Sequence, residues 1–472
     1  MVTKRTPGVY IEEISYVPPA VAAVETAIPA FIGYTDLENN KLEAKKIESL
    51  LDFEDAYCDW ENWKLTYNVR EDTSEEDFSR NELYYHMQLY FANGGGRCYV
   101  ISLGKKNKNT GGNKADFMAA LDVLSKEDEP TLILLPEASR LAYRSCMDVY
   151  QAALAQASDL MDRFVILDVP EADDEVDAFR NGIGINNLRF GAAYYPYLKT
   201  SISKYGLLNA EDFEFKNIPA EDNKRQKPEN LPKKDDEGQK PENLSKEDDE
   251  SKKTKNPNPK KEYGNLETTE MIRSIKSHTL TLPPSAAIAG VYASVDDSRG
   301  VWKAPANVSL KLVRGLARKI TDEEQAGLNV DAEGGKSINA IRPFTGQGIL
   351  VWGSRTLAGN DNEWRYVNVR RFYNFVEESV KKATRKFVFE ANDANTWVRV
   401  GSMIENFLSN LWRQGALAGG TADEAYFVKV GLGETMTNDD ILNGIMIVEI
   451  GLAAIRPAEF IILRFSHKIQ ES

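Results

Sequence analysis

The chain has 472 residues, of which 42% are hydrophobic, and its net charge at pH 7 is −14. This acidic balance argues against a protein that binds nucleic acid by neutralising phosphates, and no apolar run reaches the roughly 18 residues that a transmembrane helix needs. The three cysteines include no CxxC motif and do not form a disulfide framework, which favours folding in a reducing cytoplasm. The basic start, MVTKRTPGVY, has no apolar stretch after it, so we expect no signal peptide.

The first distinctive stretch is TPGVYIEEISYVPPAVAAVETAIPAFIGYT (6–35), which is rich in β-forming residues but interrupted by prolines at Pro7, Pro18, Pro19 and Pro29. Proline cannot donate a hydrogen bond to a β-ladder, so it is confined to sheet edges, strand starts and bulges. The stretch therefore predicts short extended pieces rather than a central strand. Such an arm needs something to pair with.

Apolar strand-like runs alternate with helical patterns from the arm to residue 209. The expected strands are 97–104, 131–136, 163–170 and 189–198, and the expected helices are 115–127, 143–161 and 174–184. Continuous apolar strands separated by helices predict a mostly parallel sheet covered on both faces. The middle of the chain is therefore expected to be α/β.

The sharpest change in composition is at 209–262, where QKPENLPKKDDEG is followed directly by the near repeat QKPENLSKEDDES. The segment is rich in both signs of charge and poor in apolar residues, so it cannot bury enough surface to offset the entropy lost on ordering. It predicts a solvated surface insertion, mobile at its tip. A binding role is the alternative.

A helix of small residues, a Gly/Pro-punctuated loop and a pair of strands around Gly346–Gly348 are expected after the insertion. The apolar spacing over 365–390 then predicts one face of a long helix, and Thr396 is expected to cap a second helix. Further strands are expected at 425–431, 444–455 and 458–469. The last of them is apolar on both faces, so it requires neighbours on both sides.

Local motifs for catalysis or metal binding are missing: the sequence contains no HExxH, GxSxG or P-loop pattern. NGGGRCYV (93–100) places its glycines before a strand, which indicates a turn rather than a phosphate cradle. Asp296 and Asp297 could hold a metal or act as acid and base, but surface carboxylates in a turn are the plainer interpretation. We therefore expect no enzyme, no cofactor and no metal.

The expected helix 365–390 carries seven basic and three acidic residues on a chain that is acidic as a whole. Lys381, Lys382, Arg385 and Lys386 lie off its apolar stripe and form a local basic face. Such a face is either solvated or rests on an acidic partner.

Seven stretches resemble, in the same order, signatures of contractile tail sheath proteins, a family that covers phage tails, R-type tailocins and phage-like contractile injection systems. They are TPGVYIEE (6–13), ETAIPAFIG (25–33), RGVWKAPAN (299–307), IRPFTGQGILVWGSRTL (341–357), FVFEANDANTWVRV (387–400), LWRQGAL (411–417) and RPAEFIILRFS (456–466). The resemblance is best over 1–35 and 282–472. The repeat insertion and the final HKIQES depart from the family pattern.

The resemblance implies an α/β fold, α+β overall, in which a central, mostly parallel α/β domain with a surface insertion is joined to a C-terminal α+β domain with extended N- and C-terminal strand-exchange arms. The implied boundaries are 1–35 for the N-terminal arm and first strands, 36–355 for the α/β sheath domain with its insertion 209–262, and 356–472 for the C-terminal domain that faces the inner tube, including the arm 456–472.

The implied function is that of a structural subunit, which polymerises around an inner tube and contracts to drive the tube through a target envelope, using energy stored in a metastable extended lattice. Strand exchange would use Val9, Tyr10, Ile11, Glu12, Phe460, Ile461, Ile462, Leu463 and Arg464. Contact with the tube, as a hypothesis, would use Lys381, Lys382, Arg385 and Lys386.

The implied partners are further copies of the chain in a helical or stacked-ring homopolymer, an inner tube protein, and a baseplate and tail terminator or cap. The resemblance also allows sister sheath proteins, and it implies neither direct nucleic-acid contact nor direct membrane insertion. The expected location is the bacterial cytoplasm during assembly, and then a phage tail or a released or membrane-attached contractile particle.

Two alternatives stay open at this point. An α/β hydrolase-like enzyme with a β appendage would be a monomer or small oligomer with a polar cluster. A tail-cap or baseplate component would have a low copy number and would not polymerise.

Overall fold

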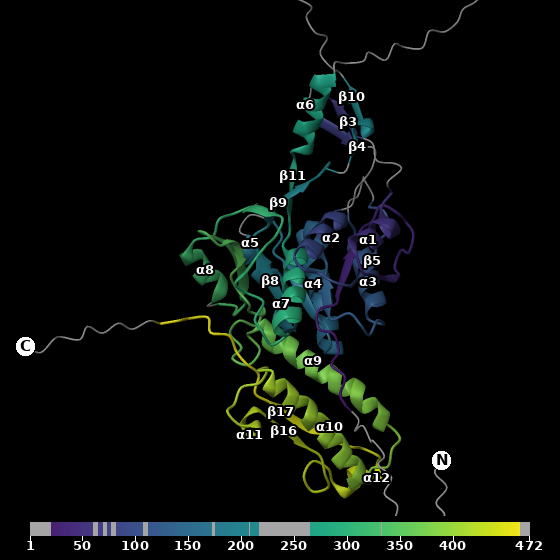
Figure 1. Cartoon of the computed structure of the whole chain (residues 1–472), viewed down its shortest axis with the longest axis vertical. Helices are drawn as coiled ribbons and strands as arrows, with labels where there is room; N and C mark the ends of the chain where they lie inside the picture. The colour runs from purple at the N-terminus through teal and green to yellow at the C-terminus, as the bar shows by residue number, and fades with distance from the viewer. Residues whose placement is uncertain are drawn as a thin grey trace, which may run out of the picture. The chain divides into compact units, whose positions relative to one another are not determined.

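The computed structural model describes residues 20–59, 65–68, 73–76, 82–106, 112–171, 175–206, 208–216, 265–331 and 333–462 (Figure 1). These residues fall into two compact units, the first made of Met1–Trp60, Ser79–Ile202 and Thr279–Ser472, the second of Glu61–Phe78 and Ser203–His278. Val9, Tyr10, Ile11 and Glu12 of the expected N-terminal arm lie outside the described residues, as do Leu463 and Arg464.

The first unit is organised around a nine-stranded sheet in the described part of the chain. Its strands, in spatial order, are β12 (Val308–Ser309), β15 (Gly348–Val351), β14 (Ile338–Phe344), β8 (Gly191–Tyr195), β7 (Phe164–Asp168), β6 (Leu132–Leu134), β1 (Pro29–Gly33), β5 (Cys98–Ser102) and β2 (Ala44–Ile47). The run from β14 to β5 is parallel, whereas β2, β15 and β12 pair in the antiparallel direction. The predicted α/β class with a mostly parallel sheet is confirmed.

Strand β1 corrects one expectation about the N-terminal stretch. It lies between β5 and β6, with Phe31 opposite Val100 on one side and Leu134 on the other, and all five of its residues are buried. Pro29 is the first residue of the strand, a place where proline is tolerated in a sheet. The expectation that 6–35 contributes no central strand was therefore wrong for Pro29–Gly33.

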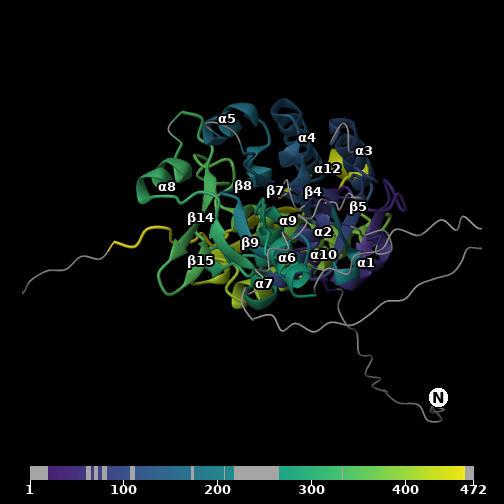
Figure 2. The same ribbon diagram turned by 90° about the horizontal axis from the view of Figure 1, so that it is seen from above.

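Helices cover both faces of this sheet, as continuous apolar strands require. Figure 2 shows helices on both sides of the sheet. One face carries α3 (Lys114–Leu124), α4 (Tyr143–Leu160) and α5 (Glu175–Gly182), and the other carries α1 (Leu50–Tyr57), α2 (Leu83–Ala92) and α7 (Ser285–Arg299). Close packing of α2 on α7 explains the small residues of α7, because a Cβ at Gly290 would come within 2.6 Å of the Tyr90 carbonyl oxygen.

Two buried carboxyl groups lie at the carboxyl ends of the parallel strands. Glu137, just after β6, accepts a hydrogen bond from the Tyr34 backbone N–H at 3.0 Å and lies 3.6 Å from the Lys106 ammonium. Asp168, at the end of β7, accepts hydrogen bonds from the backbone N–H and the hydroxyl of Ser285. Burial raises the pKa of both carboxyls to about 7, against the opposing effects of Lys106 and Ser285.

Glu137 should therefore make the folded chain less stable as the pH rises. The pKa of its carboxyl is about 7 in the folded chain and 4.5 ordinarily, so the folded state binds the proton more tightly than the unfolded state does. The resulting stabilisation is fully present below about pH 4.5 and is lost as the pH rises through 7. We expect Glu137→Gln to raise the free energy of unfolding by about 3 kcal/mol at pH 8 and by much less near pH 5. Urea unfolding at the two pH values measures this. The exposed control Asp122→Asn should change little, and an equal effect of Glu137→Gln at both pH values would contradict the prediction.

Smaller elements complete this part of the first unit. The predicted pair of strands around Gly346–Gly348 is the antiparallel hairpin β14–β15, and Gly346 adopts a positive φ of 77° in its turn. A separate three-stranded sheet contains β11 (Thr279–Leu282), β9 (Leu198–Ser203) and β13 (Val313–Leu316). The short helices are η2 (Pro136–Arg140), η3 (Leu188–Phe190) and α8 (Asp322–Asn329).

The second unit contains the folded roots of the charged insertion. Its described elements are β3 (Leu65–Asn68), β4 (Thr73–Glu76), η4 (Ala210–Asp212), β10 (Phe213–Lys216) and α6 (Asn265–Lys276). Strand β10 pairs in parallel with β3, which pairs antiparallel with β4. The expectation of a solvated insertion over the whole of 209–262 was thus wrong for its first residues, and 217–264 lie outside the described residues.

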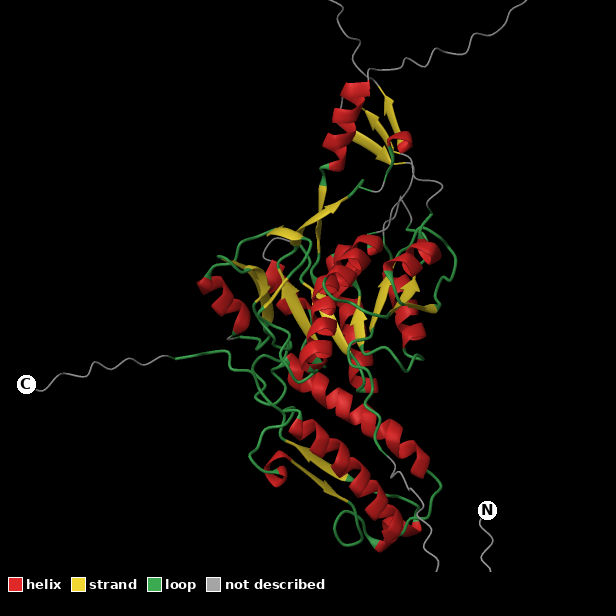
Figure 3. Ribbon diagram, in the orientation of Figure 1, coloured by secondary structure: helices red, strands yellow, loops and turns green. Residues whose placement is uncertain are grey.

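The C-terminal part of the first unit packs two long helices beside a small sheet (Figure 3). Its elements are α9 (Val367–Thr384), η5 (Arg385–Phe387), α10 (Ala394–Arg413), α11 (Ala422–Ala425), β16 (Tyr426–Lys429), α12 (Asn438–Leu442) and β17 (Glu449–Leu452). The predicted stripe is confirmed as core, since Phe372, Val376, Val380 and Phe387 are buried and the half-buried Ala383 packs against them. Two helix bounds differ from the prediction. Helix α9 ends at Thr384 rather than at residue 390, and α10 is capped by Asp393 rather than by Thr396, with the Asp393 side chain accepting a hydrogen bond from the Thr396 N–H.

Candidate assembly interface

The C-terminal sheet has only two strands in the described part of the chain. β16 and β17 are antiparallel, with Tyr426 opposite Leu452 and Val428 opposite Ile450. These four side chains pack against the helical core, and within the described residues each strand has one neighbouring strand. A two-stranded sheet is marginally stable alone, and an open edge is a template for another strand. This sheet can therefore accept strands from outside the chain.

The C-terminal apolar run is exposed. Phe460, Ile461 and Ile462 are 73%, 80% and 79% exposed, and residues 458–462 form no strand in the chain. The expected strand over 458–469 is thus contradicted for its described part. The physical reason is that no described strand lies beside these residues to pair with them. Three large apolar side chains in water favour a partner that covers them.

A hollow of about 710 Å³ lies beside the end of α9, bounded by η5, α10 and the segment 444–450. Its apolar lining includes Val380, Phe387, Ile404, Met446 and Val448, and its charged lining residues are Lys381, Arg385 and Glu390. Beside it, Val388 and Phe389 are exposed at the connection between the two long helices. The C-terminal part thus offers a mostly apolar groove with a few charged side chains in its lining.

The four basic residues predicted to contact a tube lie together at the end of α9 and in η5. Lys381 pairs with Glu378 at 3.0 Å, and Lys382 lies 3.4 Å from Glu378 and 3.4 Å from Asp128. Arg385 lies 3.8 Å from Asp128, and the Lys386 ammonium lies 5.5 Å from the centre of the Phe387 ring. The side chains of Lys381 and Arg385 are more than half exposed, so both can exchange their present partner for another carboxylate.

Two other basic residues of α9 are not part of this face, because Arg370 and Arg371 are buried. Arg371 forms a two-pronged ion pair with Asp296, with nitrogen–oxygen distances of 3.0 and 2.5 Å. Asp296 also accepts a hydrogen bond from the Thr26 hydroxyl at 2.6 Å. The expectation that Asp296 is a surface carboxylate in a turn was wrong: it lies inside α7, where burial requires a partner for its charge.

A second arginine–carboxylate pair lies just before the exposed C-terminal run. Arg355 Nε lies 2.9 Å from Glu459 Oε1, and Arg355 Nη2 lies 2.5 Å from Glu459 Oε2. The Tyr366 hydroxyl donates to the same carboxylate at 3.3 Å. Arg355 is 5% exposed in its side chain and Glu459 is 18% exposed. Pattern reasoning on the sequence missed both partners.

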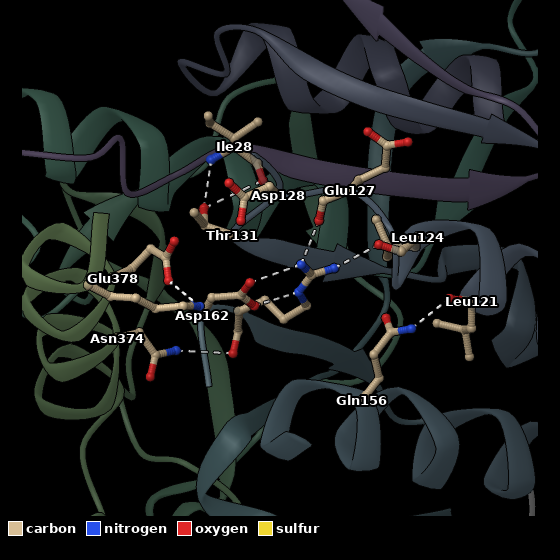
Figure 4. A network of polar contacts seen from close by, with 12 residues as sticks. Ile28, Leu121, Leu124, Glu127, Asp128, Thr131, Gln156, Asp162, Asn374 and Glu378 are labelled. Atoms are coloured by element: carbon tan, nitrogen blue, oxygen red, sulfur yellow. Dashed lines mark hydrogen bonds and ion pairs between the residues drawn. The ribbon is translucent and has the colours of Figure 1, made fainter. Parts of the chain in front are cut away.

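Figure 4 shows how the C-terminal part is joined to the central sheet. Arg163, just before β7, forms an ion pair with Asp162 and donates to the carbonyls of Leu124 and Glu127 at 3.0 and 2.8 Å. From α9, Asn374 donates to the Arg163 carbonyl at 3.0 Å, and Lys382 reaches Asp128. Polar contacts therefore fix α9 against the amino ends of the parallel strands.

Among the described residues, no three His, Cys, Asp or Glu side chains are grouped so that they could hold a metal ion. No described helix is both long enough and apolar enough to span a membrane. The arrangement offers pairing edges, apolar surface and charged contacts.

The family model for the phage tail sheath C-terminal domain matches residues 359–468. Among curated proteins, the chain is 29% identical over 130 residues to the tail sheath protein of Vibrio phage KVP40, covering 28% of this chain and 19% of that protein. It is 30% identical over 142 residues to the tail sheath protein of Burkholderia phage BcepMu, covering 29% of each. The chain therefore matches less than a third of the length of either relative.

Solved structures match over the whole length. The PVC sheath complex of an extracellular contractile injection system, in its contracted state, is 30% identical with a TM-score of 0.65, covering 100% of this chain and 99% of that one. The contracted helical sheath of the anti-feeding prophage is 32% identical with a TM-score of 0.64, covering 99% and 100%. Because this likeness spans the central domain as well as the matched C-terminal part, the chain belongs to the contractile tail sheath protein family.

Proposed function

We propose that the chain is the structural subunit of a contractile sheath that polymerises around an inner tube and drives that tube through a target envelope. The observation that carries this proposal is the whole-length likeness to two sheaths in the contracted state, at 30% and 32% identity. Assembly takes place in the bacterial cytoplasm, and the finished sheath is part of a phage tail or of an extracellular contractile particle. The other partners are the inner tube protein, a baseplate and a terminator or cap.

Strand exchange joins neighbouring subunits in this proposal. Residues Val9 to Glu12 of one copy and Phe460 to Arg464 of another add to the open edges of a neighbour's β16–β17 sheet. Each added backbone hydrogen bond contributes about 0.5–1.5 kcal/mol net, and each large apolar side chain that becomes buried adds about 1.5–3 kcal/mol. Several such terms at each junction hold subunits together. Because the contact is heterologous and does not close on itself, it grows a filament or tube.

Contraction follows from the difference between two lattices of the same subunit. The extended lattice is metastable, and the contracted lattice buries more surface between subunits. A small gain per subunit becomes large when it is summed along the sheath, and packed interfaces change between discrete arrangements rather than continuously. The C-terminal part, 356–472, faces the tube, and the charged insertion faces outward, where extra length is tolerated.

Electron microscopy of the purified full-length chain tests the proposal. Long tubes with a regular repeat are expected. A second candidate is a sheath-type subunit confined to a baseplate, which the likeness to the anti-feeding prophage baseplate in its contracted state favours, at 25% identity and a TM-score of 0.69. Short discrete particles without tubes would favour that candidate, and a monomer under all conditions would reject both.

Charge reversal at the end of α9 should separate sheath from tube. In Lys381→Glu/Arg385→Glu, we expect tubes made of sheath alone to form normally, whereas co-assembly with the inner tube should fall by at least about tenfold, since attraction to an acidic tube becomes repulsion. Co-sedimentation with tube protein measures this. Arg314→Glu/Lys319→Glu, a matched reversal of two exposed residues on the central domain, serves as the control. Normal co-assembly of the first variant would place the tube contact elsewhere.

A further inference from the structure

Each end of the described chain leaves the folded body beside a buried arginine–carboxylate pair. At the C-terminal end the pair is Arg355–Glu459, and at the N-terminal end it is Arg371–Asp296. The arginine of each pair is at most 5% exposed in its side chain. The exposed run that begins at Phe460 follows Glu459 directly.

The C-terminal pair is built on rigid supports. The Asn339 side chain of β14 accepts a hydrogen bond from the Arg355 backbone N–H and donates one to the Arg355 carbonyl, both at 2.7 Å. The backbone of Arg355 is therefore fixed through its N–H and its carbonyl. Its Nη1 donates to the Asn329 carbonyl at 3.1 Å. Upstream of Glu459, the Asn368 side chain of α9 donates to the Ile455 carbonyl at 3.0 Å. The root of the C-terminal arm is therefore tied to β14 and to the first turn of α9.

The N-terminal root is tied to the same helix. The Ser379 hydroxyl of α9 accepts from the Val24 backbone N–H at 3.2 Å, and Arg371 of α9 donates to the Thr26 carbonyl at 2.9 Å. The Thr26 hydroxyl donates to Asp296, the partner of Arg371. Both chain ends thus reach the body through contacts made by one helix.

We propose that these two pairs are anchors at which tension in the exchanged arms enters the subunit, and that α9 connects the two anchors. The proposal rests on the sheath function proposed above. A neighbour that pulls on either arm then moves the whole subunit, because the residues held at the two anchors do not shift relative to the folded body. A charge-assisted, two-pronged contact fixes direction as well as position, which a single apolar contact does not.

The test removes the charge of the C-terminal anchor and keeps its shape. Glu459→Gln in the full-length chain should leave the subunit folded, which circular dichroism confirms, and should raise by about tenfold or more the subunit concentration at which tubes sediment, as expected for a lost charge-assisted contact. Hydrogen exchange of 453–462 should also become faster. Glu363→Gln, an exposed acid-to-amide change near the start of α9, is the matched control and should sediment as wild type does.

Exchanging the two charges distinguishes an anchor within one subunit from a contact between copies. The single variants Arg355→Glu and Glu459→Arg should each lose assembly, and the double variant Arg355→Glu/Glu459→Arg should recover most of it. A 1:1 mixture of the two single variants should not recover it. Unchanged sedimentation of Glu459→Gln, or recovery in the mixture as well as in the double variant, would overturn the anchor proposal. Failure of the wild-type chain to sediment as tubes would instead overturn the sheath function, so the two failures are distinguishable.

Discussion

Removing residues 460–472, or residues 1–19, should abolish tube formation and leave a folded monomer. Both deletions remove an exchanged strand. They keep the Arg355–Glu459 anchor and the contacts of the N-terminal root, including the hydrogen bond from the Val24 N–H to Ser379, so the body of the subunit keeps its contacts. The deleted C-terminal segment includes Phe460, Ile461 and Ile462, whose exposure leaves them few contacts to lose within the chain. The expected loss of sedimenting tubes is complete, because every junction in the lattice loses the same strand.

Analytical ultracentrifugation and electron microscopy of the two deletion variants check this result. Deletion of 217–262, the charged part of the insertion, is the control and should leave assembly intact, because that segment lies outside both anchors and arms. A cohesive cylinder built from subunits that lack either arm would contradict strand exchange. A control that also fails to assemble would show that the insertion belongs to the lattice.

Arg371→Ala should be among the most damaging single substitutions for the fold of the subunit. It leaves the Asp296 carboxylate buried without its cation, and breaking a buried pair from one side typically costs about 3–5 kcal/mol. It also removes the donor to the Thr26 carbonyl and the guanidinium that lies 4.6 Å from the centre of the Tyr292 ring. The N-terminal root and α7 should loosen together.

Urea unfolding followed by tryptophan fluorescence measures the cost. Arg399→Ala is the matched control: it removes an arginine whose pair with Glu390 is 3.7 Å long and about half exposed, and such pairs are worth about 0.2–1 kcal/mol. A cost below about 1 kcal/mol for Arg371→Ala would mean that Asp296 finds another partner or water. Arg371→Met/Asp296→Leu, which removes both charges, should recover part of the lost stability.

The sequence could predict elements whose signal is local. Apolar runs located β5, β6, β7 and β8, and spacing located α3, α4, α9 and α10, because burial on a sheet or helix face repeats at a fixed interval. The exclusion of proline from strand interiors led to a wrong prediction for β1. Proline is tolerated at the first residue of a strand, and the sequence alone did not show that β1 begins at Pro29. The cap of α10 was misplaced for a similar reason, as Asp393 and Thr396 are both acceptable caps.

The contacts of the candidate interface could not be predicted in this way. Arg371 and Asp296 are 75 positions apart, and Arg355 and Glu459 are 104 apart, so no local pattern connects them. The sequence did indicate that α9 is rich in basic residues, but periodicity does not tell a buried arginine from an exposed one. The resemblance to contractile tail sheath proteins predicted the exchanged arms and the assembly. Periodicity alone predicted only an apolar C-terminal strand that lacked a partner.

The place of β1 in the middle of the sheet has a mechanical consequence. The N-terminal arm runs through a short segment into a strand whose parallel neighbours, β5 and β6, both hold it along its length. A force along such a strand loads the hydrogen bonds on both of its sides in shear, all at once. When a stretched lattice fails, the break should therefore occur at the junctions between molecules, and each molecule should come away whole.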